Sequence, residues 1–138
     1  MSNKFPAFSR SDLIKATKRD AIITETARQI IKDFGEFSLE ITFSGNPGEF
    51  YDELYSQMYN HISELMLEDT NKFQALLYRI DISQKDIDFY HRQMPNGNYN
   101  DILTELIIHR ELKKVMIRDY FRSQNNDNIT NFDDDEED

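Results

Sequence analysis

Three titratable residues recur at a spacing of four toward the carboxyl end of the sequence. Glu105, His109 and Lys113 stand at positions i, i+4 and i+8, so a helix would align them as one polar ridge. Their neighbours are mostly apolar, and charged groups in such surroundings must be paired or hydrogen-bonded. The ridge is a candidate ligand or proton-transfer site. The alternative is a structural polar network, or a ridge that lies in a solvated groove.

The histidines offer little for binding a metal. Helical bundles that hold two metal ions use Glu-x-x-His on facing helices, and the nearest match is Asp88 with His91. Glu105 and His109 have the wrong spacing, and His61 precedes its nearest acid in the reverse order. Because the second motif is missing, no metal and no cofactor is predicted.

Other enzyme chemistry is not indicated by the sequence. The chain has no cysteine and four glycines, and it contains neither a Gly-x-Ser-x-Gly elbow nor a phosphate-binding glycine loop. No catalytic residue is therefore predicted.

Length and charge predict one acidic domain. The chain has 138 residues and a net charge of −10, a size that can bury a core without disulfides. Its start lacks the pattern of a signal peptide, and it has no long apolar run, so a cytoplasmic protein without a membrane contact is expected. The domain is predicted to cover 1–123, with 1–10 flexible, and 124–138 to be a disordered acidic tail.

The charge pattern favours basic partners. Residues 127–138 contain seven acids and no base, and they follow a basic stretch within 110–122. Such a net field repels nucleic acid. The tail could bind a basic protein or fold back on the basic stretch, although solvation alone is the commoner fate of acidic tails.

Apolar periodicity predicts a mainly α, single-domain bundle of about five helices. The helices are expected at 20–34, 49–68, 70–81, 83–94 and 99–123. Gly35 is expected to end the first as a left-handed cap. The last is apolar on nearly every side except a strip near Glu111, which predicts that its neighbours enclose it.

One segment has the period of a strand. Apolar residues alternate with polar ones over 37–43, which predicts either a strand or an extended arm that covers the bundle. A strand needs a partner for its backbone groups. We therefore expect a possible homodimer or a partner's strand at this candidate interface, whose residues are Phe37, Leu39, Ile41 and Phe43.

Three tyrosines, at positions 51, 55 and 59, lie four residues apart on the second predicted helix. A helical projection puts Tyr51 in the middle of the apolar stripe, with Tyr55 and Tyr59 nearer to its edge. Tyrosine often buries its ring at the margin of a core and leaves its hydroxyl near water. This interpretation is favoured over a ligand platform.

Residues 75–92, "ALLYRIDISQKDIDFYHR", resemble the DNA-binding helix-turn-helix family in their apolar spacing and in the "DISQKDI" turn. Leu77 and Asp81 depart from the family's pattern, which has a small residue and a glycine there. The resemblance implies that base or phosphate contacts come from Gln84, Lys85, Phe89 and Arg92. Asp86 and Asp88 lie among them and would repel phosphates.

The sequence as a whole favours a non-catalytic protein–protein interaction module, a small adaptor or regulatory subunit. It would act through helical surfaces, the 37–43 segment and the acidic tail. The alternative is a DNA-binding regulator that uses residues 75–92.

Overall fold

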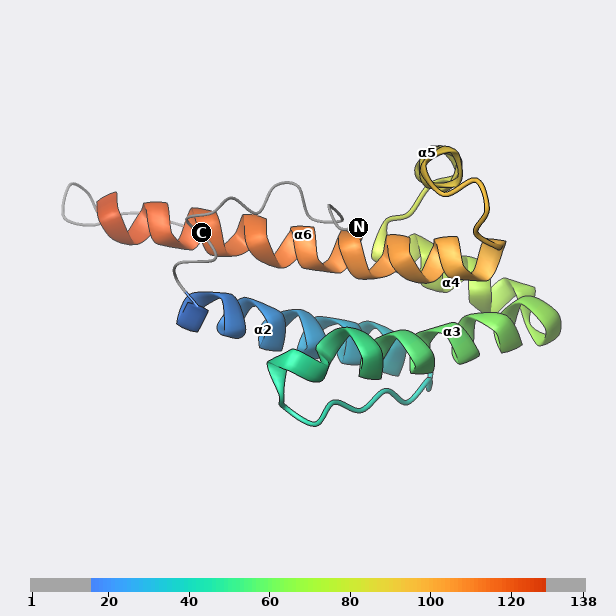
Figure 1. Ribbon diagram of the computed structural model, residues 1–138, viewed down its shortest axis with the longest axis horizontal. Coiled ribbons are helices and arrows are strands. Elements are labelled where there is room, and N and C mark those ends of the chain that lie inside the picture. Colours follow the sequence, from blue (N-terminus) through green and yellow to red (C-terminus); the bar gives the residue numbers. More distant parts are fainter. Residues whose placement is uncertain (1–15, 129–138) are drawn as a thin grey trace.

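The protein is a bundle of α-helices, as a computed structural model shows (Figure 1). The structure describes residues 16–128, with the side chains of 19–125, and the predicted mainly α class is confirmed. The elements in chain order are α2 (Ala16–Gly35), the 3-10 turn η1 (Pro47–Glu49), α3 (Phe50–Glu68), α4 (Thr70–Ile80), α5 (Gln84–Gln93) and α6 (Tyr99–Asn128). The predicted flexible start, 1–10, and most of the predicted tail, 129–138, lie outside the described residues.

Helix α6 is the element around which the others pack. It contacts α2, α3, α4 and α5, with α2 and α3 on one side and α5 on the other (Figure 1). Burial of its apolar side chains is what holds these helices together. The fully or nearly fully buried residues in its first half include Ile102, Leu103, Leu106, Ile107 and Ile108.

The second half of α6 corrects two predictions. Beyond Val115 the helix is not enclosed, since Ile117 is 47% exposed and Tyr120 and Phe121 are each 58% exposed. The reason is that α5 spans only 10 residues and covers only the first half. The helix also continues to Asn128 instead of ending near 123, because the sequence after 98 contains no glycine or proline to stop it.

Helix starts follow the local signals in the sequence. The Asp69 side chain accepts a hydrogen bond from the backbone N–H of Lys72 at the start of α4. Ser83 and Asp86 form a reciprocal capping box at the start of α5. Asn98 caps α6, with its side-chain oxygen accepting a hydrogen bond from the first turn.

The end of α2 differs from the prediction. The left-handed residue is Ser38, with φ of 62°, and not Gly35, which lies within the helix. The Leu39 N–H donates to the Phe34 carbonyl at 3.0 Å, and both side chains are buried. This is a Schellman motif, in which an apolar contact accompanies the last hydrogen bonds. The contact between Leu39 and Phe34 therefore sets where the helix ends.

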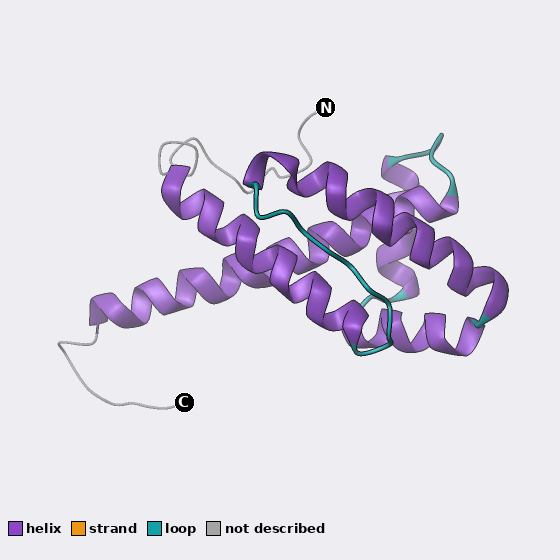
Figure 2. Cartoon of the chain, turned by 90° about the horizontal axis from the view of Figure 1, so that it is seen from below, coloured by secondary structure: helices purple, strands orange, loops and turns teal. Residues whose placement is uncertain are grey.

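Residues 37–43 form the extended arm, one of the two predicted alternatives, and no β-strand occurs between residues 16 and 128. The arm runs across the outer face of the bundle from the end of α2 to the start of α3 (Figure 2). Leu39 and Ile41 are buried, and Phe37 and Phe43 are partly buried against the core. The alternating pattern thus arises from a segment that covers helices.

Side chains of α3 take the place of a neighbouring strand. Glu53, Gln57 and His61, one helical turn apart, each bond the arm's backbone at alternate residues. Four residues of helix rise about 6 Å and two residues of extended chain span about 6.6 Å, so the two spacings nearly match. The contacts join Glu53 to Ser44 N–H, Gln57 to Thr42 N–H and C=O, and His61 to the Glu40 carbonyl.

Candidate functional site

The structure brings together two of the three residues of the predicted polar ridge. The Nε2 atom of His109 lies 3.4 Å from Oε1 of Glu105, and the Glu105 side chain is only 6% exposed. Lys113 is exposed and does not join them. The ridge therefore ends at His109, where α5 stops covering α6.

Helix α5 contributes to this polar cluster through Tyr90. Its hydroxyl is 2.9 Å from Nδ1 of His109, and the two rings lie 5.6 Å apart between centroids. Burial, together with the nearby negative charges of Glu105 and Asp86, raises the pKa of Tyr90. The tyrosine is thus a neutral hydrogen-bonding partner that fixes the imidazole.

Helix α3 contributes two of the three tyrosines noted in the sequence. The Tyr51 hydroxyl donates to Oε2 of Glu105, and the Tyr55 hydroxyl donates to Oδ1 of Asp101. Burial and these carboxylates raise the pKa of both phenols well above its ordinary value. Tyr59 stacks on Tyr55 at 6.2 Å between centroids. All three rings are half-buried, and two of the hydroxyls bond α6 instead of water.

The cluster joins three helices. Its members come from α3, α5 and α6, and each meets its neighbour through a side-chain contact that is at least partly buried. No group of three or more metal-ligating residues occurs within the described part of the chain. The arrangement suits it to fixing α3 and α5 on α6.

A second buried polar cluster was missed at the level of sequence. Glu111, expected on a polar strip of the last helix, is fully buried, and Asp33 of α2 is 2% exposed. Asp33 accepts hydrogen bonds from Gln29 Nε2 and Arg79 Nε, both at 3.1 Å. Lys114 Nζ is 3.9 Å from Glu111. One feature of the sequence could have predicted that Asp33 is buried, namely that it lies between core residues of its own helix.

Asp33 and Glu111 form a buried acid pair whose surroundings favour a proton on Glu111. Burial, the hydrogen bond to Asp33 and the charge of Asp33 raise the pKa of Glu111 to about 9. Burial opposes ionisation of Asp33, but bonds from Glu111, Gln29 and Arg79 outweigh it and lower the Asp33 pKa. Neither Glu111 oxygen has a donor among the described side chains, so the protonated acid that donates to Asp33 is the form that burial favours.

The candidate interface residues of the arm face inward. Leu39 and Ile41 are buried, and the outward positions are the polar residues Ser38, Glu40 and Thr42. One backbone edge is already bonded by α3. Any contact that residues 37–43 make with a second chain must therefore use the outward polar residues or the remaining edge.

The residues of the helix-turn-helix resemblance occupy an exposed turn and helix. Asp81, at the position where the family has glycine, is left-handed with φ of 69°, and its side chain accepts a hydrogen bond from Arg110 at 2.7 Å. Leu77 is buried. Exposed side chains on α5 include Gln84, Lys85, Phe89 and Arg92. Helix α5 packs on α6, and α4 packs on α2, α3 and α6.

The histidine motif considered for metal binding lies at the end of α5. Asp88 and His91 line a shallow open hollow of about 390 Å³ together with Arg92 and Pro95. The positive charge of Arg92 in the same lining would oppose binding of a metal cation.

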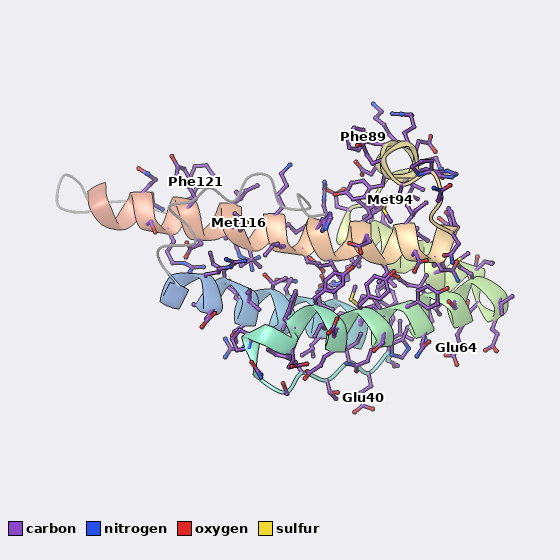
Figure 3. All side chains as sticks on the ribbon, viewed as in Figure 1. Glu40, Glu64, Phe89, Met94, Met116 and Phe121 are labelled. Atoms are coloured by element: carbon purple, nitrogen blue, oxygen red, sulfur yellow. The ribbon has the colours of Figure 1, made fainter. Side chains whose placement is uncertain are left out.

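An apolar surface on α6 was also missed. Met116, Ile117, Tyr120 and Phe121, defined here as the α6 face, are all at least partly exposed. They continue the side of the helix that α5 covers further upstream, and Figure 3 labels Met116 and Phe121 in the part of α6 that extends beyond α5. The Tyr120 and Phe121 rings form an edge-to-face pair at 5.4 Å. This is an unusually apolar stretch for a solvent-facing side of a helix.

Comparison of the chain with known protein families, with curated proteins and with solved structures finds no match. Among residues 16–128, none of the helices combines the length and apolar character that a membrane crossing requires.

Proposed function

We propose that this chain is a non-catalytic protein–protein interaction module, an adaptor or regulatory subunit, and that the α6 face is its main binding surface. The observation that carries the proposal is the exposure of Ile117, Tyr120 and Phe121 on a helix whose first half is enclosed by its neighbours. Helix α5 packs on this same side of α6 in the first half of the helix. A second protein would cover the α6 face in the second half.

The chemistry of the face suits protein binding. Aromatic residues and methionine are enriched at the centres of interfaces, where they are desolvated most completely. Tyr120 and Phe121 hold each other in an edge-to-face pair, so they lose less freedom on binding than isolated rings. Exposed Lys113 at the near end of the face adds a site for a carboxylate of the partner.

The polar groups support binding over catalysis. Glu105 pairs with His109 on α6 and accepts a hydrogen bond from Tyr51 of α3, and Glu111 is fully buried beside Asp33. A substrate needs an accessible concave site with convergent polar groups. The titratable groups here are instead used between helices.

The test is capture of partners with matched surface variants. Tagged wild-type protein is compared with Tyr120→Asp and Phe121→Asp, and with Leu67→Asp as the control, since Leu67 is 87% exposed on α3. Proteins captured by the wild type and by Leu67→Asp, but lost by at least tenfold with both α6 variants, support the proposal. Equal capture by all four proteins contradicts it.

DNA binding is a second candidate because one observation favours it. Asp81 adopts the left-handed conformation that the helix-turn-helix family obtains from glycine, and Lys85 and Arg92 are exposed on α5. A gel shift with mixed genomic DNA at low salt tests this. Retardation that is lost in Lys85→Glu and Arg92→Glu would support DNA binding, and no retardation would exclude it.

A further inference from the structure

We propose that the α6 face binds a second copy of this chain, with the two α6 helices antiparallel about a two-fold axis near residues 118 and 119. This inference rests on the proposed function and names the partner of the same surface. It places the dimer contact on α6 and not on the arm at 37–43.

The first reason is the symmetry of the face. Along this side of the helix, the residues are Lys113, Met116, Ile117, Tyr120, Phe121 and Gln124. Their spacing of 3, 1, 3, 1 and 3 reads the same in both directions, as does the order of one polar, four apolar and one polar residue. An interface with two-fold symmetry uses the same patch on both copies. The pattern is therefore self-complementary when the helices run in opposite directions.

The second reason is the pairs that this symmetry produces. Met116 lies opposite Phe121 of the partner subunit, and Ile117 lies opposite Tyr120 of the partner subunit. Contacts between a methionine sulfur and an aromatic ring are favourable by about 0.3–1.5 kcal/mol. Each pair occurs twice, so all four apolar side chains of both copies leave water together.

The third reason is charge. Position 110 of one copy lies opposite position 127 of the other, so the basic stretch with Arg110, Lys113 and Lys114 approaches the last turn of the partner's α6, which contains Asp127. Within one helix these positions are about 25 Å apart. A parallel pair would instead put like charges side by side, which is destabilising.

The fold leaves room for this arrangement. Helix α5 covers α6 only in its first half, and the second half extends beyond α5 (Figure 1). Among residues 16–128, no other element covers the side of α6 opposite α2 in the overlap that begins near residue 110. The packed helix α5 limits the overlap at one end, which favours a closed dimer over an open filament.

Cysteine cross-linking tests the register, because the chain has no cysteine of its own. Single-cysteine variants carrying tags of two sizes are mixed and oxidised. The mixture of Lys113→Cys with Gln124→Cys, and that of Ile117→Cys with Tyr120→Cys, should form mixed disulfides. Lys113→Cys alone should not, since its two copies would be about 16 Å apart along the axis, beyond the reach of a disulfide of about 7 Å between Cα atoms.

Several results would overturn the inference. Efficient cross-linking of Lys113→Cys to itself would indicate a parallel pair, and a monomer at millimolar concentration in sedimentation would exclude self-association. In the expected case, Tyr120→Asp lowers the dimer fraction at least tenfold at a concentration where Leu67→Asp leaves it unchanged. A monomeric wild type that still loses captured proteins when Tyr120 is replaced would reject this dimer and retain the proposed function.

Discussion

The side chain of Gln57 bonds both backbone polar groups of Thr42. Its Oε1 accepts from the Thr42 N–H at 2.8 Å, and its Nε2 donates to the Thr42 carbonyl at 2.8 Å. A neighbouring strand satisfies a residue in the same way in a sheet. One glutamine on a helix thus replaces a strand, which explains how the arm stays extended without a β-ladder.

Replacing Gln57 should therefore release the middle of the arm. Gln57→Ala removes both bonds to Thr42, and each exposed bond contributes roughly 0.5–1.5 kcal/mol. We expect a loss of about 1–2 kcal/mol in urea unfolding and faster hydrogen exchange of the Thr42 amide. Ser56→Ala, an exposed change on the same helix, is the control. An unchanged Thr42 exchange rate in Gln57→Ala would show that the arm is held by its apolar side chains alone.

The neighbouring tyrosines permit a matched comparison. Tyr51→Phe removes a hydroxyl that donates to Glu105, and the loss of this donor to a buried carboxylate should cost about 1–3 kcal/mol. The Tyr59 hydroxyl has no bond to another described residue, although its ring stacks on Tyr55, so Tyr59→Phe should change stability by less than about 0.5 kcal/mol. Chemical unfolding of both variants measures the difference. Equal stabilities would mean that the rings matter and the hydroxyls do not.

At the end of α2, the sign of a change in stability distinguishes a helical Gly35 from a left-handed Gly35. Gly35 is helical and no atom lies within 4 Å of a Cβ added there, so Gly35→Ala should stabilise the protein by about 0.5–1 kcal/mol. A left-handed Gly35 would make the same change destabilising. Ser38 has the positive φ, and Ser38→Gly should be neutral or stabilising. Thermal unfolding of both variants reports the two signs.

Much of the fold could be predicted because its signals are local. The capping residues Asp69, Ser83 and Asn98 act within one turn, and the apolar period shows which side of each helix is buried. The cap at Ser38 could not be predicted in this way. It depends on Leu39 reaching the buried Phe34, and Gly35 gave a stronger local signal in the wrong place.

The sites were harder to predict because they depend on distant partners. Glu105 and His109 share a helix, so their spacing showed that they could meet. Tyr51 and Glu105 belong to different helices, and no local pattern joins them. Glu111 looked like a solvent-facing acid, because only the packing of α2 on α6 puts Asp33 beside it.

The acid pair makes stability depend on pH in a defined direction. Glu111 has its pKa raised to about 9 in the folded protein from the ordinary 4.5, so the folded state keeps a proton that the unfolded state releases. Its contribution is complete below about pH 4.5 and is lost as the pH rises toward 9. The lowered pKa of Asp33 acts in the opposite direction, and its contribution is lost only in strong acid.

Glu111→Gln should remove most of this dependence. The amide of glutamine can donate to Asp33 at every pH, while Arg79, Lys114 and Arg118 stay in place around the pair. Between pH 5 and 9 the free energy of unfolding of the wild type should fall relative to the variant, by at most about 1.4 kcal/mol per pH unit. Urea unfolding at four or five pH values measures this. Glu25→Gln, which removes an accessible acid paired with Arg118, should follow the wild type, and parallel curves for all three proteins would mean that Glu111 does not hold the proton.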